Sequence, residues 1–370
     1  MDDPIKGEGR MITDANGITR REGGISGIWN NMFNDSNAIK ADSPPLIPDI
    51  RDILEVFPQS LRENLVNKIS EAIDYEPVIG VMGKTGAGKS SVCNALFQGE
   101  VCAVSDVEAC TREAQELRIR FGKRSLKIID IPGVGENALR DKEYEDLYRT
   151  LLPSLDLILW VIKGDDRAFS ADEHFYNNVL LPAGGGERVL FVLNQVDKIE
   201  PFREWNTYLH QPSPAQRINI EKKESYITER FGFTRYPVIP ISADEGYNIL
   251  RLVETMIRAL PDRAKSSTAS QFKEEYKTDD VKTEAKGGFA SVLSGILDDV
   301  IDSVPLPKPV KELARKGKDK VIEWAGNVWD HFFWIRKICN ETTDYSCTAD
   351  SVICCSVCSC RWRLRPAMPA

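Results

Sequence analysis

The stretch Gly83-Lys84-Thr85-Gly86-Ala87-Gly88-Lys89-Ser90 decides the fold, because it fits the pattern G-x-x-x-x-G-K-[ST]. The apolar run 77–82 before it predicts a buried strand, and residues 91–97 after it predict the start of a helix. A phosphate-binding loop needs this context, since backbone N–H groups and the helix N-terminus then surround phosphate oxygens. A plain glycine-rich turn is the alternative interpretation, and the motifs that follow in the sequence distinguish the two.

Within this loop, Lys89 is expected to reach the β- and γ-phosphates, and the hydroxyl of Ser90 to ligate Mg²⁺. The phosphate-binding residues predicted here are Gly83, Lys84, Thr85, Gly86, Ala87, Gly88, Lys89, Ser90 and Ser91.

Three further motifs follow in order, each at the carboxyl end of an apolar run. The run 125–130 ends in D-x-x-G, which places Asp130 for Mg²⁺ and the N–H of Gly133 for the γ-phosphate. The run 188–193 ends in Asn194-Gln195-Val196-Asp197, and the run 237–241 ends in Ser242-Ala243. Ligands of open α/β sheets bind at such strand ends.

The segment 194–197 is similar to the guanine-reading motif N-K-x-D. An Asp197 carboxylate there accepts from guanine N1–H and the exocyclic amine, and a base without both donors leaves it unpaired. The predicted guanine-binding residues are Asn194, Gln195, Asp197, Ser242 and Ala243.

Taken together, these motifs resemble the Era/septin-like GTPases (the TrmE-Era-EngA-septin-like class), and more closely the prophage-encoded bacterial GTP-binding proteins of the YeeP/YfjP type. The resemblance covers about residues 46–300, with matching stretches at 75–84, 104–112 and 130–136. It implies a Ras-like domain, GTP or GDP as ligand, Mg²⁺ as cofactor and slow hydrolysis. It also selects Thr111 as the switch threonine that reaches Mg²⁺, whereas spacing alone leaves Ser105 open.

Two departures from the family pattern concern affinity and turnover. Gln195 stands where most relatives have a lysine, whose stem packs over the base and whose amine braces the phosphate loop. Glutamine can do part of this, so guanine specificity should survive with lower affinity. Val134 follows Gly133, where Ras-type enzymes place the glutamine that orients water, and Gly86 replaces the asparagine that holds potassium in some relatives. The catalytic residue is therefore unknown from the sequence.

Charge and the absence of targeting signals favour a protein of the cytoplasm, and the resemblance implies a bacterial source. The 370 residues carry a net charge of −8, so the overall field does not favour nucleic acid. No signal peptide and no run of eighteen apolar residues is visible. The three histidines are scattered and suggest no histidine-based catalysis.

The expected fold class is α/β, a Ras-like P-loop domain with a mostly parallel sheet and helical flanks. Strands are predicted near 78–82, 115–121, 125–130, 156–162, 188–193 and 237–241. Helices are predicted near 89–97, 141–152, 171–181, 214–230 and 248–260. The predicted parts are a disordered lead (1–45), a helical segment (46–75), the GTP-binding domain (76–261), a charged linker (262–286), an amphipathic helical region (287–335) and a Cys-rich tail (336–370).

The C-terminal part leaves alternatives open. Apolar residues of 287–335 recur at helical spacing and include Trp324, Trp329 and Trp334, which fits either a helical hairpin packed on the protein or an amphipathic contact with a membrane or partner. In the tail, Cys355 and Cys358 have zinc-ligand spacing, but an unstructured or altered-reading-frame extension is favoured.

The sequence thus predicts a slow Mg²⁺-dependent GTPase that acts as a switch. Two alternatives remain: a nucleotide-gated binding module with negligible turnover, and a dynamin- or immunity-type GTPase that acts at a membrane through 287–335. An unknown protein effector and self-association are expected as partners.

Overall fold

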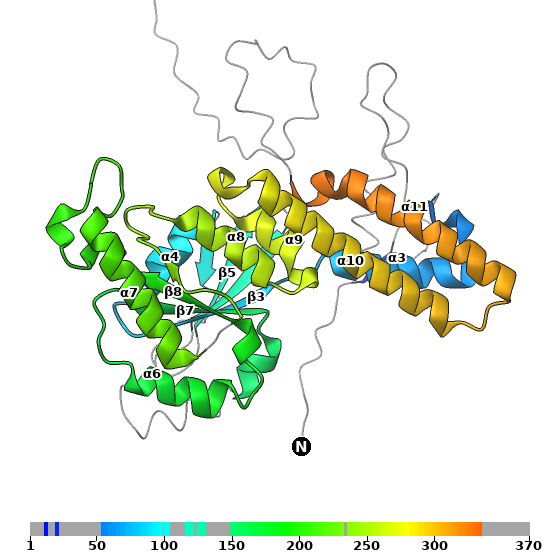
Figure 1. Ribbon diagram of the computed structural model, residues 1–370. Coiled ribbons are helices and arrows are strands. Elements are labelled where there is room, and N and C mark those ends of the chain that lie inside the picture. The colour runs from blue at the N-terminus through cyan, green and yellow to red at the C-terminus, as the bar shows by residue number, and fades with distance from the viewer. Residues whose placement is uncertain are drawn as a thin grey trace, which may run out of the picture. The chain divides into compact units, whose positions relative to one another are not determined.

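A seven-stranded sheet forms the centre of the protein in a computed structural model (Figure 1). The structure describes residues 53–98, 100–103, 115–121, 124–130, 149–232 and 235–334, and a small hairpin of β1 (Met11–Thr13) and β2 (Thr19–Arg21). Residues 335–370 form a separate unit, which lies outside the described residues.

The strand order of the sheet is β4-β5-β6-β3-β7-β8-β9. The strands are β3 (Val78–Met82), β4 (Glu100–Ala103), β5 (Gln115–Phe121), β6 (Arg124–Asp130), β7 (Leu157–Lys163), β8 (Val189–Asn194) and β9 (Ile239–Pro240). The five strands from β6 to β9 are parallel, and β4 and β5 are antiparallel to their neighbours. The predicted fold class, a mostly parallel Ras-like sheet with helical flanks, is confirmed.

Register brings the predicted motifs to one edge of this sheet. Val81 of β3 lies opposite Asp130 of β6, and Lys163 of β7 lies opposite Asn194 of β8. Because β3, β6, β7 and β8 are parallel, the segments that follow them leave the sheet at the same edge.

Helices cover both faces of the sheet. One face packs under α6 (Ser170–Phe175), the π-helical turn η3 (Tyr176–Leu180) and α7 (Pro214–Phe231), around the buried Trp160. The other face packs under α4 (Lys89–Leu96), α8 (Ile249–Ala259) and α9 (Asp262–Gln271). The helices α3 (Gln59–Ile73), α10 (Asp279–Ser303) and α11 (Lys308–Phe333) pack on one another and, through α10 and α11, on α9, and they extend this core to one side of the sheet (Figure 1). β7 supplies both cores because it is buried on both sides, as its continuously apolar sequence predicts.

Short helical turns complete the described part. They are η1 (Leu54–Val56), η2 (Leu152–Ser154), η4 (Gly186–Arg188), η5 (Val196–Lys198), η6 (Phe202–Glu204) and η7 (Glu274–Tyr276). The helical segment expected over 46–75 contains η1 and α3, whereas most of the helix expected over 141–152 lies outside the described residues.

The expected linker over 262–286 is packed structure instead. Residues 264–271 of α9 are all buried, and α10 begins at Asp279. The charges that suggested a tether are paired, since Nζ of Lys265 lies 2.6 Å from Glu284 and 3.0 Å from Asp262. Small Ser, Thr and Ala side chains let α10 pack closely on α9.

The apolar faces of α10 and α11 are buried within the protein. Phe289, Leu293 and Leu297 of α10, and Trp324 and Trp329 of α11, are at most 5% exposed. The indole N–H of Trp329 donates to Oγ of Ser266 on α9 at 2.9 Å. The residues that suggested a membrane contact therefore form a helical hairpin packed on α3 and α9. In the described part of the chain, no helix is both long and apolar enough to cross a membrane.

Candidate functional site

The glycine-rich loop joins β3 to α4 at the carboxyl edge of the sheet. Gly88 stands at the N-cap of α4 with φ +86°, in the left-handed region that favours glycine. A Cβ at this position would lie 2.4 Å from Nδ2 of Asn194, so the close approach of the two segments also requires glycine. The loop therefore meets the N-K-x-D-like segment directly.

Side chains from neighbouring strand ends hold the backbone carbonyls of this loop. Asn194 donates from Nδ2 to the carbonyl of Ala87 at 2.9 Å, and Gln195 donates from Nε2 to the carbonyl of Gly86 at 3.1 Å. From within the loop, Nζ of Lys89 donates to the carbonyl of Gly83 at 3.0 Å. Gln195 thus makes the bracing contact that the lysine of N-K-x-D was expected to make.

Asn194 also ties the loop to the segment after β9. Its Oδ1 accepts from the backbone N–H of Ala243 at 3.1 Å, and the residue is 1% exposed. In the same segment, Oγ of Ser242 donates to Oδ1 of Asp197 at 2.6 Å. The predicted guanine-binding residues Asn194, Gln195, Asp197, Ser242 and Ala243 are therefore in one place, next to the glycine-rich loop.

Asp130 lies at the end of β6, beside the start of α4. Its Oδ1 lies 3.8 Å from Nζ of Lys89 and has no hydrogen-bond partner among the described residues. Burial raises the pKa of this carboxyl, and the nearby charge of Lys89 offsets only part of that rise. Oδ1 is buried, but the Asp130 side chain as a whole is 36% exposed. Such a carboxylate fits a hydrated cation, since Mg²⁺ prefers oxygen ligands and keeps several waters.

Several predicted site residues cannot be placed. Thr111, Gly133 and Val134 lie outside the described residues, as does most of the segment 101–113 in which the switch was expected, and so do Cys355 and Cys358 of the tail. Among the described residues, no cluster of three or more histidine, cysteine or carboxylate side chains could hold a metal ion.

Sequence reasoning missed three acidic residues at the predicted site, two of which contact it through their carboxylates and one, Glu245, through its backbone N–H to Oγ of Ser242 at 3.4 Å. Asp166 and Asp172, from the loop after β7 and from α6, pair with Lys84 of the glycine-rich loop at 2.9 and 2.8 Å. Glu245, in the segment after β9, accepts from Nε1 of Trp205 at 3.3 Å. Their one signal in the sequence is position, because each follows a strand of the sheet on its carboxyl side.

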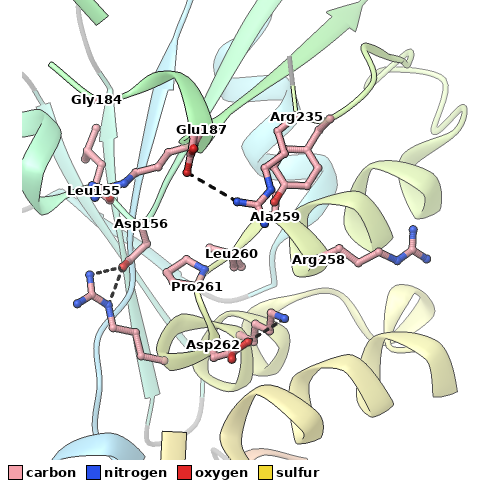
Figure 2. Close-up of a pocket in the computed structure, with 14 residues that line it drawn as sticks. Leu155, Asp156, Gly184, Glu187, Arg235, Arg258, Ala259, Leu260, Pro261 and Asp262 are labelled. Atoms are coloured by element: carbon pink, nitrogen blue, oxygen red, sulfur yellow. Dashed lines mark hydrogen bonds and ion pairs between the residues drawn. The ribbon is translucent and has the colours of Figure 1, made fainter. Parts of the chain in front are cut away.

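A polar cavity of about 460 Å³ lies elsewhere, at the amino ends of β7 and β8 (Figure 2). Its floor holds Asp156, whose side chain is buried and accepts from Arg263 at 2.9 Å, while Arg235 lies 3.9 Å from Glu187. None of the described residues that the sequence predicts to bind phosphate lines this cavity.

Comparison with known proteins identifies the family. The model of the 50S ribosome-binding GTPase family matches residues 78–195. YkfA of Escherichia coli K12 is 42% identical over 281 residues, which cover 75% of this chain and 94% of YkfA. YfjP of the same strain is 40% identical over 288 residues, which cover 78% of this chain and 98% of YfjP. The chain belongs to the YkfA/YfjP family of P-loop GTPases.

This membership confirms the resemblance found in the motifs. Other GTPases of the Era and Der types match at lower identity, among them GTPase Era of Halothermothrix orenii, 28% identical over half of this chain and 55% of that protein. A solved structure of Aquifex aeolicus Era bound to GDP·AlF4⁻ covers 50% of this chain and 56% of its own, with 24% identity and a TM-score of 0.35.

Proposed function

We propose that this GTPase binds GTP with Mg²⁺ at the loop 83–90, hydrolyses it slowly to GDP and phosphate, and acts as a switch. The observation that carries the proposal is the position of Asn194. Its one buried side chain contacts both the phosphate loop and the segment 242–243, so the two halves of a nucleotide site are assembled together.

In this proposal the backbone N–H groups of 83–91 and the ammonium of Lys89 bind the phosphates. Asp197, fixed by Ser242, accepts from the guanine base, and Ala243 backs the guanine oxygen. Ser90 and Asp130 hold Mg²⁺ when it is bound, together with Thr111, and Mg²⁺ neutralises charge on the phosphate oxygens. Gly133 is proposed to meet the γ-phosphate.

Turnover should be slow because the usual water-orienting group is missing. Valine at 134 cannot hydrogen-bond water, and Gly86 has no amide to hold potassium. We expect rates of about 10⁻⁴ to 10⁻² s⁻¹, as in unassisted GTPases, with little difference between potassium and sodium. Acceleration would then require self-association or a protein effector that supplies the missing group.

A binding module with negligible turnover is the second candidate, since the same absence of a water-orienting residue favours it. A peripheral membrane contact through 287–335 is less favoured, because it would require the buried faces of α10 and α11 to separate from α3 and α9.

Nucleotide binding and single-turnover phosphate release test these candidates. Lys89→Ala should lower GTP affinity at least about tenfold, since a hydrogen bond to a charged group is worth about 1.5–3 kcal/mol. Asp197→Asn should shift preference toward xanthine nucleotides, because the acceptor becomes an amide that also donates. If the wild type binds GTP but releases no phosphate, the binding module is favoured. If both variants bind GTP as tightly as the wild type does, the proposed nucleotide site is refuted.

A further inference from the structure

The side chain of Lys84 is tied to the neighbouring loop rather than free in the phosphate loop. Its Nζ lies 2.8 Å from Oδ2 of Asp172 and 2.9 Å from Oδ2 of Asp166, and it also donates to the carbonyl of Ala168. We infer that Lys84 and Asp172 form a strut that positions the phosphate loop for nucleotide binding. This inference rests on the proposed function.

Burial of Asp172 means that its carboxylate needs a charged partner, and Lys84 is that partner. The side chain of Asp172 is 6% exposed, and a buried carboxylate is costly unless it is paired. Burial alone would lower the pKa of Lys84, but its ion pairs with Asp172 and Asp166 outweigh burial and raise that pKa. Burial also raises the pKa of Asp172, and the charge of Lys84 offsets only part of that rise. Lys84 therefore stays charged, and the two carboxylates keep it in place.

The loop that receives Lys84 is itself held on its far side. Oδ1 of Asp166 accepts from the backbone N–H of Ala168 at 3.0 Å, which closes a short turn. Lys223 of α7 donates to the carbonyl of Asp166, and its Nζ lies 4.9 Å from the ring centroid of Phe169. The loop 164–169 thus connects the phosphate loop to α7, with Lys84 on one side and Lys223 on the other.

The strut completes a set of contacts along the phosphate loop. Lys89, Gln195 and Asn194 hold the carbonyls of Gly83, Gly86 and Ala87, and Lys84 fixes the segment between the first two. A loop that is already ordered loses less freedom when it binds, so preorganisation increases affinity. The charge of Lys84 is balanced by carboxylates, so its contribution is position rather than neutralisation of phosphate.

The test is binding of fluorescent GDP and GTP to the full chain, measured with Asp172→Asn and Lys84→Met. A strut holds backbone that both nucleotides contact, so each variant should weaken GDP and GTP by the same factor. We expect about tenfold, the change that corresponds to about 1.4 kcal/mol. Lys84→Arg keeps the charge and should restore most of the affinity, which a general loss of folding stability would not explain.

Asp165→Asn is the matched control, because Asp165 adjoins Asp166 but pairs with Lys163 on the surface. It should leave both affinities unchanged. If Lys84→Met does not fold, because it leaves the buried Asp172 without its partner, the comparison of Asp172→Asn with the wild type still decides.

Two results would overturn the strut. Tighter GTP binding by Asp172→Asn would show that Lys84, once released, acts on the phosphates directly. Unchanged affinity in Lys84→Met, with normal GTP binding by the wild type, would show that the loop needs no such support. Loss of GTP binding in the wild type itself would instead refute the proposed function.

Discussion

The contact between Gly88 and Asn194 can be tested with a pair of alanine substitutions. Gly88 and Gly86 have nearly the same backbone conformation, with φ +86° and +82°. A Cβ at Gly86 would meet nothing within 4 Å, whereas a Cβ at Gly88 would lie 2.4 Å from Nδ2 of Asn194. Gly86→Ala therefore carries only the cost of a left-handed alanine, about 1–2 kcal/mol.

Gly88→Ala should lower the free energy of unfolding more than Gly86→Ala does, because the new Cβ also displaces Asn194. Asn194 makes two hydrogen bonds here, to the carbonyl of Ala87 and from the N–H of Ala243. At about 0.5–1.5 kcal/mol each, their loss adds about 1–3 kcal/mol to the backbone term. The free energy of unfolding should therefore fall by about 2–5 kcal/mol in Gly88→Ala.

Urea unfolding without nucleotide, followed by circular dichroism, measures this difference directly. Nucleotide is left out so that lost binding does not add to lost stability. Equal destabilisation by the two substitutions would show that Asn194 does not press against the loop, and the assembled site described above would then be incorrect.

Three further predictions address affinity, pH and the helical flank. Gln195→Lys should tighten GDP binding, because a lysine stem covers the base while its amine can still reach the carbonyl of Gly86; calorimetry showing weaker binding would contradict this. Burial and the charge of Asp156 raise the pKa of Tyr75 to about 12. Between pH 10 and 12 only the unfolded chain loses this proton, so the free energy of unfolding should decline there, and it should decline less in Tyr75→Phe. Trp329→Ala should lower the free energy of unfolding by about 3–5 kcal/mol, because a fully buried indole and its bond to Ser266 are lost; a change below 1 kcal/mol in urea would mean that α11 does not pack as described.

The fold and the site motifs could be predicted because both depend on local patterns. A glycine-rich loop works only after a strand and before a helix, and each later motif directly follows an apolar run, so sequence order alone places them at one edge of the sheet. The bracing role of Gln195 was also foreseen, since it follows from the position of one residue in a known motif.

The linker predicted over 262–286 was wrong, and the two alternatives for 287–335 could not be separated, because burial depends on what covers a helix. Residues 262–271 are polar and charged, yet α9 is buried, with Lys265 paired to Asp262 and Glu284. The apolar face of α10 and α11 has the same helical spacing whether a membrane or α3 covers it.

What the sequence by itself determined is the sheet, the glycine-rich loop between β3 and α4, and the order of the motifs along one sheet edge, since strand periodicity and motif spacing act over a few residues. The guanine-binding role of 194–197 and 242–243 stays a prediction. Only the tertiary structure decided which side chains meet from distant segments: Lys84 with Asp172, Asn194 with Gly88, and Trp329 with Ser266. Such pairs are set by how strands and helices pack in three dimensions, and no local sequence pattern predicts which distant side chains come into contact.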